Sequence, residues 1–128
     1  MVMPLVAFAL WTGVILLATL LPIPEATISA IGFEYTDKLV HYFLFLVMVL
    51  IAVWFGSRFL GSFGSSVSFG VIWCALLAGG TEFAQSFLPL RNMSLLDFVA
   101  DTAGIIYGCT VYALKIIEDR YDLTLWQI

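Results

Sequence analysis

The side chains of this chain that could do chemistry fall into three short groups at helical spacing: Asp37 with Lys38 and His41, Glu82 with Gln85, and Asp97 with Asp101. Residues three or four apart lie on the same face of a helix, so each group forms one polar edge. Carboxylates beside an imidazole can exchange protons as general acid and base. We therefore predict a catalytic site in which Glu82 and Asp97 act as acid and base. We expect two further residues to assist them, His41 and Asp101.

Two basic residues could hold the anionic group of a substrate. Lys38 and Arg91 both carry hydrogen-bond donors that suit a phosphate. We expect Gln85 to orient the bound group and Asp37 to complete the substrate-binding side. Tyr42 is a further candidate for substrate binding, with packing between helices as its alternative role. This combination favours a membrane lipid headgroup or a lipid-linked cell-wall precursor as the substrate.

The composition decides where these polar groups must lie. Of the 128 residues, 62% are hydrophobic and only 11% are charged, and the mean hydropathy is +1.08. A soluble domain of this size could not bury so much apolar surface, which predicts a membrane protein. The formal net charge of -4 leaves no basic stripe for phosphate backbones, which excludes nucleic acid as a partner.

Four apolar runs are long enough, or nearly so, to cross a bilayer as helices: residues 3–21, 39–56, 67–88 and 95–116. Continuous hydrophobicity without alternation favours helices over barrel strands. We predict a single all-α domain over residues 1–128, a four-helix transmembrane bundle. The first run is expected to be a retained helix rather than a signal peptide, because no Lys or Arg precedes it.

Helices that alternate in direction would bring all the polar groups to one membrane face and both termini to the other. Lys and Arg are enriched on the cytoplasmic side of membrane proteins. The terminal side would carry Arg58, Lys115 and Arg120, against Lys38 and Arg91 opposite. We therefore expect both termini to be cytoplasmic and the polar groups to face outward.

A stripe of small residues predicts which helices meet closely. Gly104 and Gly108 lie below Asp101 on its helix, and Ala78 and Gly79 lie below Glu82. Small residues let helix backbones approach each other. We expect the helices over residues 67–88 and 95–116 to meet along these stripes.

The polar motifs, in their order, resemble the VanZ-like family of bacterial membrane proteins. The resemblance rests on Asp37-Lys38-x-x-His41-Tyr42, Glu82-x-x-Gln85, Pro89-x-Arg91-x-x-Ser94-x-x-Asp97, and then Gly104 and Gly108. It runs from about residue 37 to residue 108. It implies a small multi-pass protein of the bacterial inner (cytoplasmic) membrane, linked by the family's name to resistance against lipoglycopeptide antibiotics of the teicoplanin kind. Asp101 departs from the family pattern, in which Asn is common at this position.

The residues leave three function classes open. The first is a membrane hydrolase or transferase acting on an anionic lipid or lipid-linked precursor. The second is a non-catalytic protein that binds a lipid or a partner, in which the polar groups form a structural ion-pair network. The third is a proton-coupled carrier. Four short helices give little room for two alternating states and show no inverted repeat, so a carrier would need at least a homodimer.

No cofactor is expected, but a divalent cation stays open as an alternative. His41, Glu82, Asp97 and Asp101 are all side chains that can bind such a cation. Magnesium or calcium shared with a phosphate would suit them. Zinc is not expected, because His41 is the chain's single His and there is no cysteine cluster.

Overall fold

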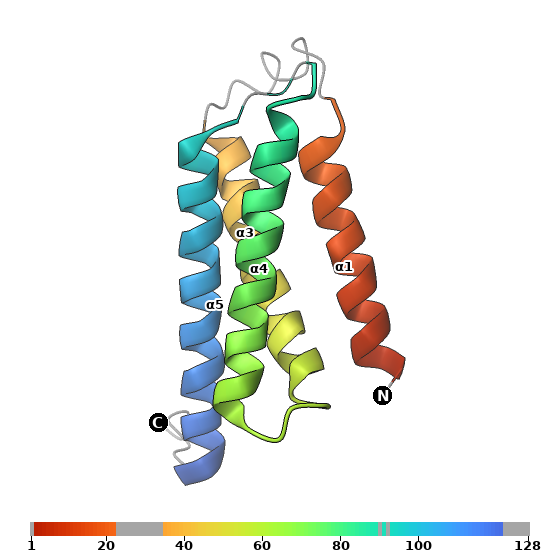
Figure 1. Cartoon of the computed structure of the whole chain (residues 1–128). Helices are drawn as coiled ribbons and strands as arrows, with labels where there is room; N and C mark the ends of the chain where they lie inside the picture. Colours follow the sequence, from red (N-terminus) through yellow and green to blue (C-terminus); the bar gives the residue numbers. More distant parts are fainter. Residues whose placement is uncertain (1, 23–34, 90, 92, 122–128) are drawn as a thin grey trace.

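The described residues form an antiparallel bundle of four helices. The computed structural model describes residues 2–22, 35–89, 91 and 93–121. Its helices are α1 (Val2–Leu20), α3 (Thr36–Gly56), α4 (Phe63–Gln85) and α5 (Leu95–Tyr121). Consecutive helices run in opposite directions, so that α1 begins and α5 finishes at the same end of the bundle (Figure 1). The all-α fold class predicted from the sequence is confirmed.

All four helices are long and apolar enough to cross a membrane. Their outer faces carry large apolar side chains, including Leu10, Leu76 and Ile106, each more than half exposed. Such surfaces are unfavourable in water and suit contact with lipid. Four such helices support a multi-pass membrane protein.

Helix α3 is the centre of the bundle. It contacts each of the other three helices, and its contact with α5 is the most extensive in the structure. Most of the buried hydrophobic core among the described residues comes from α3, namely Leu44, Phe45, Met48, Val49, Ala52 and Val53. The other three helices are therefore positioned by their contacts with α3.

The glycines of α5 explain its close approach to α3, and they correct one expectation. A Cβ atom at Gly104 would collide with the carbonyl oxygen of Tyr42, and one at Gly108 would collide with Val49. Both neighbours belong to α3. The stripe of small residues thus faces α3 and not α4, and a Cβ at Gly79 would have no neighbour within 4 Å.

The helix boundaries differ from the expected ones for local reasons. Helix α4 begins at Phe63, four residues early, because the Ser62 side chain accepts a hydrogen bond from the backbone N–H of Ser65 at 3.1 Å and caps the helix. It ends at Gln85 rather than at residue 88. Helix α5 runs past residue 116 to Tyr121, and its last turns carry a Lys115–Asp119 ion pair at 3.0 Å.

Candidate functional site

The polar residues meet at the end of the bundle where α1 and α4 finish and where α3 and α5 begin, here called the polar end. The opposite end, which carries the described chain termini, is called the terminal end (Figure 1). His41 follows the first residue of α3 by five positions, and Asp101 follows the first residue of α5 by six. At about 1.5 Å per residue, these side chains lie roughly 7.5 and 9 Å inside their helices.

His41 and Asp101 form the most buried contact of the site. The Nδ1 atom of His41 lies 2.8 Å from Oδ1 of Asp101, and the two residues are 2% and 0% exposed. The close approach of α5 to α3 at Gly104, three residues after Asp101, makes this contact possible. A buried carboxylate that accepts from one ring nitrogen fixes the orientation of the imidazole.

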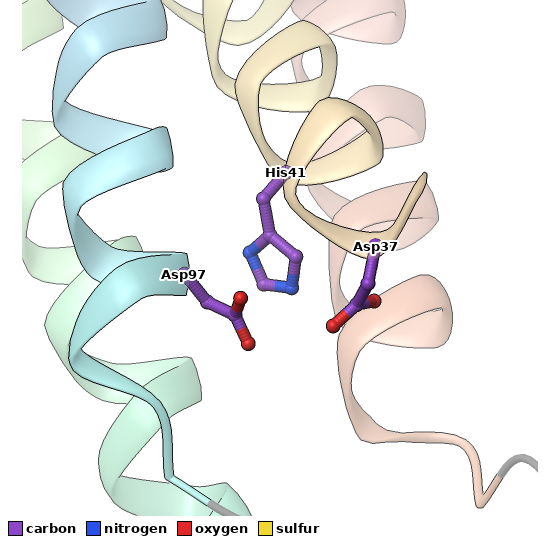
Figure 2. A group of neighbouring side chains, drawn as sticks. All are labelled: Asp37, His41 and Asp97. Atoms are coloured by element: carbon purple, nitrogen blue, oxygen red, sulfur yellow. The ribbon is translucent and has the colours of Figure 1, made fainter. Parts of the chain in front are cut away.

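The other edge of the imidazole faces two more carboxylates. Figure 2 shows the His41 ring pointing into the space between the side chains of Asp37 and Asp97. Asp97 is buried, whereas Asp37 is exposed at the start of α3. The Lys38 ammonium lies 3.1 Å from Oδ1 of Asp97, and the Lys38 side chain as a whole is 28% exposed. We call Asp37, Lys38 and Asp97 the outer group.

Glu82 approaches His41 and Asp101 from α4. Its Oε2 atom accepts a hydrogen bond from the backbone N–H of Ser94 at 2.9 Å, just before α5 begins. Glu82 is 5% exposed although it lies only three residues, about 4.5 Å, before the end of α4. This is shallower than the sequence suggested, because α4 ends at Gln85. We call His41, Glu82 and Asp101 the inner group.

Two sets of three side chains could hold a metal ion: the inner group, and Asp37 together with His41 and Asp97. One ligand atom from each member of the inner group lies within 4.8 Å of the others, and the same holds for Asp37, His41 and Asp97. Within the described part of the chain, Oε1 of Glu82 and Oδ2 of Asp101 are buried and have no hydrogen-bond partner. Buried polar atoms nearly always have a partner, so these two are unusual.

The two groups together carry an excess of negative charge. Four carboxylates, those of Asp37, Glu82, Asp97 and Asp101, face one ammonium and one imidazole. Even a protonated His41 would leave two carboxylates uncompensated. Because buried charge is costly in a low dielectric, the cluster favours protons or an added cation.

Gln85 and Arg91 lie apart from these groups and bind α1. Gln85 donates from Nε2 to the carbonyl of Thr19 at 2.8 Å. Arg91 donates to the carbonyls of Ala18 at 2.8 Å and Leu21 at 2.9 and 3.0 Å. The last carbonyls of a helix lack partners within it, so both residues cap α1. Their expected role in substrate binding stays a prediction.

The structure thus brings together six of the nine residues singled out from the sequence, namely the inner and outer groups. Tyr42, the last of the other three, packs its ring against Phe43 and Tyr107, with centroids 5.1 and 6.3 Å away.

Sequence reasoning missed the backbone N–H of Ser94 as the partner of Glu82. A signal is present in the sequence, since Ser is a preferred N-cap residue and Ser94 directly precedes α5; its hydroxyl lies 3.4 Å from the Asp97 backbone nitrogen.

These features define a four-helix membrane protein with a buried site of carboxylates and one imidazole. The chain is similar to an uncharacterized protein of the yeast Schizosaccharomyces pombe, with 32% identity over 76 residues. The aligned part is 59% of this chain and 45% of the yeast protein, so the chain spans less than half of that protein's length. No family model matches the chain, and no solved structure matches it.

These findings overturn the predicted membership of the bacterial VanZ-like family. The similarity found is to a fungal protein, and no family model supports the assignment. The motifs misled because spacings of three and four residues are what any polar site built on helices requires. The expectations of antibiotic resistance, of a bacterial cell envelope and of a bacterial inner membrane lose the support of that resemblance.

Proposed function

We propose that this protein binds the phosphate-bearing headgroup of a membrane lipid at the polar end and catalyses its hydrolysis or transfer. One observation carries the proposal: polar side chains lead without a break from exposed Asp37, through half-buried Lys38, to buried Asp97 and His41. In a membrane-spanning bundle, the ends of the helices lie at the level of the lipid headgroups.

The outer group has suitable chemistry for such a substrate. Lys38 is the basic residue at the mouth of the site, and its ammonium can leave Asp97 to bind a phosphate. Asp97 is then free to take a proton from water or from an acceptor hydroxyl. That oxygen forms a bond to phosphorus while the bond from phosphorus to the leaving alcohol breaks. The alcohol oxygen receives the proton from Asp97, which restores the carboxylate.

A purely structural ion-pair network is the competing interpretation, and the charges argue against it. A network that only holds helices together would be expected to balance its charges, because burying an unpaired carboxylate is strongly destabilising. Here three buried carboxylates, those of Glu82, Asp97 and Asp101, share one ammonium and one imidazole, so at least one of them stays unpaired. Residues retained at such a cost in a membrane bundle usually serve binding or transport.

The roles of the basic residues favour an outward-facing polar end. Arg91 caps α1 and Lys38 pairs with Asp97, so local contacts account for both basic residues at this end. Arg58, Lys115 and Arg120 lie at the terminal end. The enrichment of basic residues on the cytoplasmic side of membrane proteins therefore supports a cytoplasmic terminal end.

The proposal is tested by mass spectrometry of lipids from cells that make the wild type or Asp97→Asn at equal membrane abundance. Asp119→Asn is the matched control, because Asp119 is an exposed carboxylate at the far end of the same helix. We expect a lipid species that appears or disappears with the wild type and with Asp119→Asn, but not with Asp97→Asn. Identical lipid profiles for all three proteins would refute catalysis.

A further inference from the structure

The inner group, His41, Glu82 and Asp101, lies outside the chemistry proposed above. These residues come from three different helices, α3, α4 and α5, and are 2%, 5% and 0% exposed. One ligand atom from each lies within 4.8 Å of the other two. That limit is about twice a typical bond length between a divalent cation and oxygen, so one ion could reach all three with small side-chain movements.

We propose that the inner group binds a single divalent cation, and that Mn²⁺ fits its ligands best. This site goes beyond the proposed lipid chemistry and does not depend on it. Two carboxylates and one imidazole form an oxygen-rich ligand set with one nitrogen, which Mn²⁺ accepts readily. Calcium prefers oxygen alone, and structural zinc sites are usually built from Cys and His.

Two orphaned oxygens point to a ligand at this place. Oε1 of Glu82 and Oδ2 of Asp101 are buried and have no hydrogen-bond partner within the described ranges. Leaving a buried charged acceptor without a partner is costly, and a cation between these carboxylates would satisfy both. Two carboxylates, a neutral imidazole and one divalent ion also sum to zero charge, which suits a buried position.

The distances agree with ligands that share one ion. Nδ1 of His41 and Oδ1 of Asp101 are 2.8 Å apart. Neighbouring ligands in an octahedron with bonds of about 2.1 Å lie roughly 3 Å apart. The existing contact can therefore open to admit a cation with little change in either side chain.

The second possible group, Asp37, His41 and Asp97, is less suitable. Asp37 is exposed, and Asp97 already pairs with the Lys38 ammonium at 3.1 Å. A cation bound there would face a like charge at close range, which is unfavourable. The inner group has no Lys or Arg within hydrogen-bond distance among the residues that the structure describes.

The test is a titration of the full chain, purified in detergent, with Mn²⁺ under electron paramagnetic resonance, where free Mn²⁺ gives a six-line signal that binding suppresses. We expect one equivalent to bind to the wild type. Glu82→Gln and Asp101→Asn should each weaken binding by more than about tenfold, since each removes a ligand. Asp37→Asn and Asp119→Asn are the matched controls and should bind like the wild type.

Pulsed measurements on the wild type add a readout that needs no variant. They should detect magnetic coupling between bound Mn²⁺ and one imidazole nitrogen. The proposed site would be refuted by a lack of stoichiometric binding, by a lack of nitrogen coupling, or by unchanged binding in Glu82→Gln. Loss of binding in Asp37→Asn would also refute it and would favour the set of Asp37, His41 and Asp97 instead. Asp97→Asn separates the two proposals, because it should bind Mn²⁺ normally yet lose the lipid change.

Discussion

Gly104 of α5 lies against the backbone carbonyl of Tyr42 in α3, one turn deeper in the bundle than the contact between His41 and Asp101. The two helices can come this close because position 104 has no side chain. The most buried pair of the site therefore depends on a glycine that takes no part in its chemistry.

The first prediction concerns the helix contact itself. In Gly104→Ala, the added methyl group would meet the Tyr42 carbonyl and, at 3.0 Å, the Leu46 nitrogen. These are backbone atoms of the central helix and cannot turn aside, so we expect the free energy of unfolding to fall by about 1–3 kcal/mol. Denaturation in detergent, followed by circular dichroism, measures it.

Gly80→Ala is the matched control for this change. Gly80 is also helical, but a Cβ there would have no neighbour within 4 Å. Its stability should stay the same or rise by up to about 1 kcal/mol, because Ala favours helix over Gly. Equal effects at the two positions would show that the contact with Tyr42 does not limit the approach of α5.

The second prediction concerns the cap that Arg91 provides. Arg91→Met removes the hydrogen bonds to the carbonyls of Ala18 and Leu21. We expect the free energy of opening the last turn of α1 to fall by about 1–3 kcal/mol, because the lost hydrogen bonds come from a charged donor. The turn should therefore open more often. Hydrogen exchange with mass spectrometry should show faster exchange at residues 17–21 than in the wild type. Arg58→Met, at the other end of the bundle, should leave that segment unchanged.

The third prediction separates a structural from a functional role for the pair of Lys38 and Asp97. Lys38 is 28% exposed and covers the buried Asp97, so its removal should let water reach the Asp97 carboxylate, and the loss of stability should be about 1 kcal/mol or less. Lys38→Met should therefore unfold almost like the wild type, yet lose the lipid change. A large drop in stability that Lys38→Met/Asp97→Asn restores would instead favour a structural ion pair.

The fourth prediction concerns orientation. In a background with Cys74→Ala and Cys109→Ala, one new cysteine is placed at each end of the bundle: Phe87→Cys at the polar end and Gly61→Cys at the terminal end. Phe87 is 72% exposed, and a Cβ at Gly61 has no neighbour within 4 Å. A membrane-impermeant maleimide should label Phe87→Cys in intact cells and Gly61→Cys only after lysis. The reverse pattern would place the polar end in the cytoplasm.

Much of the fold was predictable because two strong signals agree. The length of each apolar run indicates a membrane helix. Because the helices alternate in direction, the polar groups then lie at one end of the bundle. The start of α4 was missed by four residues, because the glycines and serines that follow Ser62 are weak helix formers and hide the N-cap signal of Ser62. The sequence alone does not predict which helix lies at the centre of the bundle. Because α3 lies there, Gly104 faces α3 rather than α4.

The site was predictable in its members but not in its pairings. Spacing along one helix places Asp97 and Asp101 on one face, but it cannot say that Asp101 meets His41 while Asp97 meets Lys38. Those contacts depend on the relative height of α3 and α5, which packing sets. The contacts of Arg91 could not be predicted for a similar reason, because the carbonyls that accept its hydrogen bonds, those of Leu21 and Ala18, lie 70 and 73 residues earlier in the chain.

This separation in the chain bears on how the protein is made. A ribosome produces α1 well before it produces Gln85 and Arg91, so the carbonyls at the end of α1 must find water or lipid headgroups during that interval. Only when the segment between α4 and α5 has emerged can these carbonyls exchange those temporary partners for permanent ones. The end of the first helix to enter the membrane is thus capped late, and a chain truncated before Gln85 would lack both of the residues that cap it.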